Sequence, residues 1–133
     1  MSTKKIDQLG NLITLVPADD IEYLLDSEHF ELTTQERLRR YYTHNDLNVE
    51  QTPEDTPSGP LYTEELTALV SMEPDDVLLF STVPIVVFLR TLRGRDIAWG
   101  TLDYPVKCTP RTGVDFVELH LTHKSPVMLN WHG

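Results

Sequence analysis

Five short segments rich in β-branched and aromatic residues constrain the fold of this chain most strongly. Runs of this kind, separated by Gly, Pro and Asp, are typical of β-strands. The tripeptide Arg93-Gly94-Arg95 predicts a tight turn between the second and third of them. The second half of the chain is therefore predicted to form a mainly antiparallel sheet of about five strands. The predicted strands are 77–80, 85–92, 97–104, 114–122 and 127–131.

Residues 117–122 alternate strictly between apolar and polar side chains. Because successive strand side chains point to opposite faces of a sheet, one set should be buried and the other exposed. Val114 and Phe116 have the opposite parity, and a β-bulge near Phe116 would reconcile the two halves of this segment. We expect burial of Val117, Leu119 and Leu121, and exposure of Glu118, His120 and Thr122.

The first half of the chain predicts helices after one strand. Residues 11–16 are apolar and end at Pro17, as a short strand would. Asp19 or Asp20 then stands where a helix N-cap is expected, before Ile21, Leu24 and Leu25. Thr33 and Glu36 have capping-box spacing, which predicts a helix from 33 to about 44. Residues 62–72, with Leu66, Leu69 and Val70 at helical spacing, predict a further short helix that ends before Pro74.

Residues 48–60 are polar and contain three prolines, which predicts a flexible loop. The expected architecture is therefore an α+β fold, with an N-terminal strand and two to three short helices packed on the C-terminal sheet. The length of 133 residues fits one domain. Its expected parts are a strand with helices over 1–47, the loop over 48–60, and a helix followed by antiparallel strands over 61–133.

The negative charge is concentrated in the first half. Residues 1–66 carry 14 acidic and 5 basic side chains, whereas residues 67–133 carry 7 acidic and 6 basic ones. An acidic surface repels nucleic acids and anionic membranes and attracts basic proteins. Direct binding to nucleic acid or membrane is therefore disfavoured, although acidity can also serve solubility alone.

No metal or cofactor site is expected from the motifs. His120 and His123 are three residues apart, and on a strand such residues point to opposite faces. Cys108 has no second cysteine with which to form a zinc motif or a disulfide. The acidic clusters at 19–22 and 73–76 fall at expected helix starts and turns, where carboxylates have structural roles.

One catalytic alternative remains. The sequence His120-Leu121-Thr122 resembles the His-x-Thr motif of the two-histidine phosphoesterases, in which one imidazole accepts a proton and another donates one. That chemistry needs a second copy of the motif, and the chain has none. A small hydrolase that uses His120 and Thr122 is kept as an alternative.

We therefore expect a non-enzymatic, acidic inhibitor or accessory factor, of the phage-encoded or immunity type, that docks on a basic surface of a larger protein. A minor assembly subunit of a virion or other particle is a second alternative, and a homodimer is compatible with either. The N-terminus lacks the apolar segment of a signal peptide, so a cytoplasmic location is expected. Candidate partner-binding residues are exposed acids and the two tryptophans: Glu28, Glu54, Asp55, Glu64, Glu65, Trp99 and Trp131.

Overall fold

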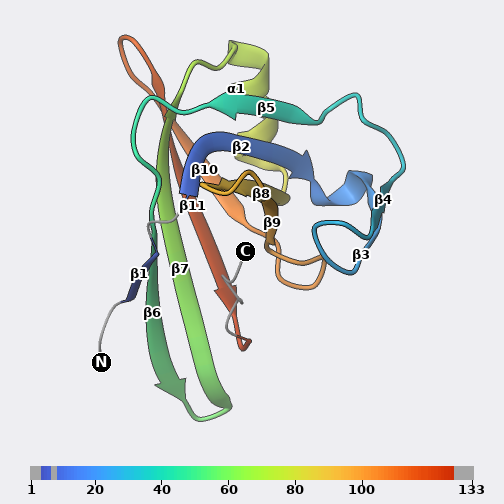
Figure 1. Cartoon of the computed structure of the whole chain (residues 1–133), viewed down its shortest axis with the longest axis vertical. Helices are drawn as coiled ribbons and strands as arrows, with labels where there is room; N and C mark the ends of the chain where they lie inside the picture. The colour runs from blue at the N-terminus through green and yellow to red at the C-terminus, as the bar shows by residue number, and fades with distance from the viewer. Residues whose placement is uncertain (1–3, 7–8, 128–133) are drawn as a thin grey trace.

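Two antiparallel sheets form the body of the protein, and a single α-helix of the described residues covers one end (Figure 1). The computed structural model describes residues 4–6 and 9–127. In chain order the elements are β1 (Lys4–Ile6), β2 (Leu9–Pro17), the 3₁₀-helix η1 (Ala18–Asp20), β3 (Ile21–Leu24), β4 (Phe30–Leu32), β5 (Arg39–Tyr42), β6 (Val49–Thr56), β7 (Gly59–Val70), α1 (Pro74–Thr82), β8 (Ile85–Thr91), β9 (Asp96–Trp99), β10 (Lys107–Thr112) and β11 (Val117–Ser125).

The sheets differ in strand order and direction. Sheet A has the order β1-β6-β7-β11-β10, sheet B has the order β5-β2-β8-β9, and β3 pairs with β4 as a separate hairpin. In Figure 1 the strands β6, β7 and β11 run along the long axis of the molecule, while β2 and β5 cross them. Crossed sheets of this kind bury one face of each sheet against the other.

The main core lies between the two sheets. Strand alternation sends Ile13 and Leu15 from β2, and Leu119 and Leu121 from β11, into this space, where they are almost completely buried. Phe80 of α1 belongs to the same cluster, so the helix closes the core at one end. A smaller apolar cluster forms on the outer face of sheet B, where the β3–β4 hairpin covers side chains of β2 and β8.

The chain crosses from sheet B to sheet A after β9. Gly100 has a φ of 94°, and a Cβ there would lie 2.9 Å from Val106 Cγ2, so this turn requires glycine. Val106 then exchanges two backbone hydrogen bonds with Ile85, the first residue of β8. This pair joins the two sheets directly ahead of β10.

The predicted α+β class is wrong, because the described chain is mostly β-structure with one α-helix and three sheets. The strand at 11–16, the strand at 85–92 and the turn at Arg93-Gly94-Arg95 are confirmed as β2, β8 and the β8–β9 turn. The segment 97–104 is a strand only in its first part. Residues 128–131 of the last predicted strand lie outside the described residues.

The two helices predicted in residues 19–44 are absent. Asp20 caps no helix; its buried carboxylate accepts two hydrogen bonds from Arg37, at 2.6 and 2.9 Å. Thr33 donates to the Asp20 backbone carbonyl instead of capping a helix. These contacts tie the segment after β4 to η1, and the chain continues directly into β5.

Residues 48–72, predicted as a loop and a helix, form the long β6–β7 hairpin. The helical interpretation used Leu66, Leu69 and Val70, but the buried positions of β7 recur every second residue, at Leu66, Ala68 and Val70. An amphipathic segment can match the helical period of about 3.6 residues or the strand period of 2. Here the pairing with β6 and β11 selects the strand. The predicted mobile loop is therefore wrong as well.

The segment 77–80 was predicted as a strand and lies in α1. Pro74 is at the first turn of this helix, where its missing N–H costs nothing, and Asp75 and Asp76 stand where the helix dipole favours acids. Pro74 thus begins a helix instead of ending one. No helix in the described part of the chain is long and apolar enough to span a membrane.

The predicted faces of β11 are confirmed. Its apolar residues Val117, Leu119 and Leu121 are buried, and on the opposite face His120 is exposed while Glu118 and Thr122 are half-buried. The expected bulge is not found, because β11 begins at Val117 and the preceding residues form the β10–β11 turn.

Candidate functional site

A buried carboxylate, Glu64 of β7, is the centre of a polar cluster between the sheets. Only 1% of Glu64 is exposed. Its Oε1 accepts hydrogen bonds from His123 Nδ1 at 2.8 Å and from Trp99 Nε1 at 3.1 Å. Its Oε2 accepts one from Gln51 Nε2 at 2.7 Å. Four strands, β6, β7, β9 and β11, thus contribute one side chain each, and both sheets are joined through one carboxylate.

The surroundings of Glu64 shift its titration. Burial alone would raise the pKa of Glu64, but the hydrogen bonds from His123, Gln51 and Trp99 outweigh burial and hold this pKa below its usual value. The carboxylate is therefore ionised in the folded protein at neutral pH. His123 Nδ1 must carry the proton of its hydrogen bond, because a carboxylate can only accept.

A lowered pKa makes folding stability depend on pH. The unfolded chain binds a proton at Glu64 more readily than the folded chain does, so the stabilisation from Glu64 is present above about pH 4.3 and is lost at lower pH. We expect urea unfolding between about pH 6 and pH 3 to show a smaller loss of stability for Glu64→Gln than for the wild type. Glu65→Gln should keep the wild-type profile. Parallel profiles for all three proteins would contradict the assignment.

This cluster has the chemistry of a structural link more than of a reaction site. His123 is 97% buried, and its Nε2 has no hydrogen-bond partner among the described residues. None of the four side chains lines the surface hollow on the outer face of sheet A. A buried carboxylate that is held by three donors fixes how the two sheets are aligned.

The outer face of sheet A carries that hollow, which has a volume of about 260 Å³. Strand pairing places Glu50 of β6 directly opposite Glu65 of β7, and both are exposed. Asp46 reaches the same hollow from the β5–β6 connection, which Asn45 holds against β7 by two hydrogen bonds with backbone groups of Thr67 and Leu69. We define the acidic hollow as the cavity lined by Asn45, Asp46, Asn48, Glu50, Glu65, Leu66, Thr67, His120, Leu121 and Thr122.

The residues considered for catalysis lie in two places, His120 and Thr122 in the acidic hollow and Cys108 in the interior. His120 and Thr122 both line the acidic hollow, but His120 Nε2 pairs with Glu118 Oε1 at 3.0 Å and no hydrogen bond joins it to Thr122 in the described structure. Cys108 is buried, and burial raises the pKa of its thiol to about 12. Among the described residues, no group of three or more His, Cys, Asp or Glu side chains is placed to hold a metal ion.

The predicted partner-binding residues fall into three groups. Glu54, Asp55 and Glu65 are exposed on the β6–β7 hairpin, and Glu28 is exposed in the β3–β4 turn, away from the hairpin. Glu64 and Trp99 are buried together and are not available to a partner. Trp131 lies outside the described residues.

Sequence analysis missed Asp46 and Glu50 as members of the acidic hollow. Asp46 lies between the predicted helix and the predicted loop, and the assignment of Glu50 to that loop hid the register that pairs it with Glu65. No apolar alternation marked this strand in the sequence, because Gln51 is buried although it is polar. Pro53 in the same segment also disfavoured a strand.

Comparison with known proteins gives no family assignment. The chain matches no protein-family model, no curated protein and no solved structure at a significant level.

Proposed function

We propose that this protein is a non-enzymatic interaction protein whose outer face of sheet A docks on a basic surface of a larger partner. The observation that carries this proposal is the acidic hollow, which combines a concave shape with three carboxylates, those of Asp46, Glu50 and Glu65. None of these carboxylates forms an ion pair with a described side chain.

The like-charged pair of carboxylates in the hollow favours the binding of a cationic side chain. Glu50 and Glu65 lie directly opposite each other on neighbouring strands, an arrangement that destabilises a sheet slightly. A lysine or arginine side chain of a partner that enters the hollow would remove this repulsion and gain two attractive contacts. The exposed Glu54 lies on the same face of β6 by strand alternation and extends the negative potential along the hairpin.

The proposal predicts that charge reversal in the hollow weakens binding to cationic peptides. With oligolysine as the probe, Glu50→Lys/Glu65→Lys should bind about tenfold or more weakly than the wild type at low salt, because each exposed charge pair is worth up to about 1 kcal/mol. Binding by the wild type should also fall steeply with salt. Titration calorimetry measures both effects.

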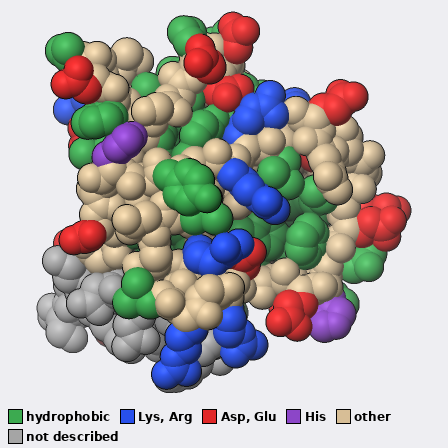
Figure 2. All heavy atoms as spheres, turned by 45° about the horizontal axis from the view of Figure 1, so that its top comes forward, with side chains coloured by type: hydrophobic (Ala, Val, Ile, Leu, Met, Phe, Trp, Pro, Cys, Tyr) green, Lys and Arg blue, Asp and Glu red, His purple; other side chains and the backbone are tan. Residues whose placement is uncertain are grey.

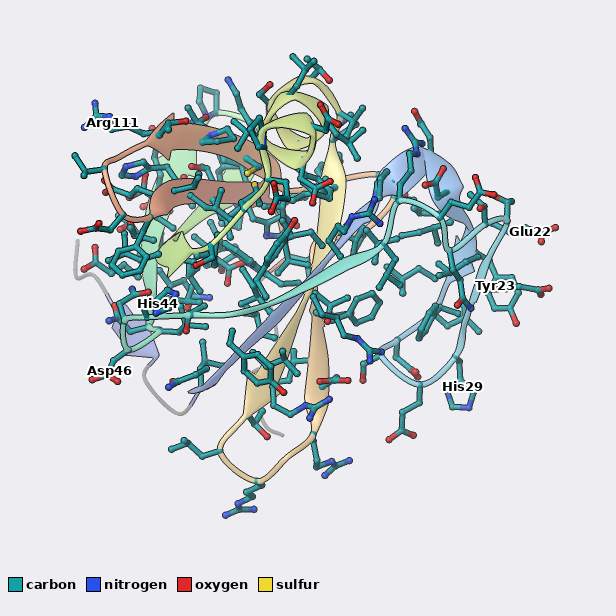
Figure 3. All side chains as sticks on the ribbon, turned by 90° about the horizontal axis from the view of Figure 1, so that it is seen from above. Glu22, Tyr23, His29, His44, Asp46 and Arg111 are labelled. Atoms are coloured by element: carbon teal, nitrogen blue, oxygen red, sulfur yellow. The ribbon has the colours of Figure 1, made fainter. Side chains whose placement is uncertain are left out.

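The matched control carries the same change in net charge at a distant place. Glu22→Lys/Glu28→Lys alters two exposed acids of the β3–β4 hairpin, and Figure 3 shows Glu22 on the opposite side of the molecule from Asp46. This control should retain binding close to that of the wild type. Equal losses in both variants would show that only net charge matters, and the hollow would then have no special role.

A further inference from the structure

A second charged surface, opposite in sign, lies on the outer face of sheet B. The β3–β4 hairpin covers only part of this face. On the part left open, Arg40 and Tyr42 of β5 lie on the same face of sheet B as Arg90 of β8, because Thr14 of β2 pairs with both Arg40 and Phe88. The β8–β9 turn adds Arg93 and Arg95. We call these five residues, with Leu92, the arginine–tyrosine surface.

Its composition is that of a protein-binding surface. Tyr42 is 78% and Leu92 is 73% exposed, and tyrosine and arginine are the residues that most often anchor interfaces. Arg90 pairs with Asp96, but Arg40, Arg93 and Arg95 form no ion pair with a described side chain. Figure 2 shows apolar and basic side chains in the middle and lower part of this face, with acidic ones mainly toward its rim.

We propose that the occupant of the arginine–tyrosine surface is the acidic hollow of a second copy of this chain. The argument is charge complementarity within one sequence. The uncompensated arginines of sheet B match the uncompensated carboxylates Asp46, Glu50 and Glu65 of sheet A. The two surfaces share no residue and belong to different sheets, so one molecule can use both at once.

Local charge decides this contact despite the net charge of −10. At physiological salt the Debye length is about 8 Å, so charges elsewhere on two copies are largely screened while facing groups in the contact are not. Tyr42 and Leu92 add apolar area that salt does not weaken. Because the two surfaces differ, the contact is heterologous, and copies associate head to tail into a ring or an open chain.

Sedimentation velocity of the purified protein over a range of concentrations tests the contact. The wild type should exceed its monomer mass of 15.3 kDa at about 0.15 M salt and return toward the monomer at about 1 M salt, where the Debye length is about 3 Å. Arg40→Glu/Arg95→Glu and Glu50→Lys/Glu65→Lys should each lose association by tenfold or more. Mixed in equal amounts, these two variants should associate again, because each offers the charge that the other lacks.

Two control variants change charges away from the proposed contact. Arg111→Glu changes an exposed arginine that Figure 3 places far from the β8–β9 turn, and Glu22→Lys changes a distant acid. Both variants should associate like the wild type. A monomeric wild type at every concentration overturns the inference. So does association that depends on the arginines but not on Glu50 and Glu65, or a mixture that stays monomeric. The inference rests on the acidic hollow of the proposed function, but oligolysine binding by the dilute monomer is measured separately, so failure of one can be distinguished from failure of the other.

If the wild type stays monomeric, two probes can distinguish between the other kinds of molecule that could bind the arginine–tyrosine surface. An oligoglutamate peptide that binds the wild type but not Arg40→Glu/Arg95→Glu would indicate a foreign acidic protein. A single-stranded oligonucleotide that does so would indicate nucleic acid, with Tyr42 stacking on a base. Either result replaces the second copy as the occupant.

Discussion

Glu64→Ala is expected to lower the free energy of unfolding by about 3–5 kcal/mol, because a buried donor left without its acceptor costs about 1–3 kcal/mol. The truncation leaves three buried donors, on Gln51, Trp99 and His123, without their acceptor. A buried donor that loses its acceptor has given up its hydrogen bonds to water without a replacement, and this destabilises the folded state. Urea unfolding followed by tryptophan fluorescence measures the change, and Trp99 lies inside the perturbed cluster.

Glu65→Ala is the matched control for this prediction, because it removes the same side chain from the next residue of β7. Glu65 is exposed on the opposite face, so its loss should change the free energy of unfolding by no more than about 0.5 kcal/mol. Similar costs for the two variants would mean that the Glu64 cluster does not hold the sheets together.

Leu119→Ala should destabilise the protein by about 2–5 kcal/mol, as truncation of a core leucine does. Leu119 is fully buried between the sheets and belongs to the main apolar cluster. His120→Ala, one residue along β11, removes an exposed side chain whose contact with Glu118 lies on the surface and is worth about 1 kcal/mol or less.

Thermal and urea unfolding of this pair of variants check the faces of β11. If His120→Ala were the costlier change, the outer face of sheet A would have to be held by contacts that the described structure does not contain. His120 would then become a candidate for a functional role within the acidic hollow.

Prediction from the sequence was most successful where the local residue pattern and the contacts with neighbouring strands favour the same secondary structure. The strict alternation of residues 117–122 was sufficient to assign the faces of β11, and the β-branched run at 85–92 was sufficient to predict β8. Residues 33–44 show the limit. A capping-box pattern at Thr33 was outweighed by the Asp20–Arg37 pair, a contact between residues far apart in the chain.

The candidate sites were predicted only in part. Glu65 and the exposed acids of the β6–β7 hairpin were identified from charge alone, but Glu64 was assigned to the same surface although it is the most buried carboxylate of the described structure. Adjacent residues of a strand point to opposite faces, so this error followed from the helical interpretation of β7. The arginine–tyrosine surface gave no sequence signal, since its members come from β5, β8 and the turn that follows β8.

The sequence by itself determined the strands with one dominant period, the turn at Gly94, the negative charge of the first half and the buried face of β11. These features depend on residues that are close together along the chain. The tertiary structure decided that residues 59–70 are a strand, that Glu64 is enclosed and that Glu50 faces Glu65. Each of these depends on pairing between distant segments, because an amphipathic run adopts the period that lets its apolar side chains reach a common core.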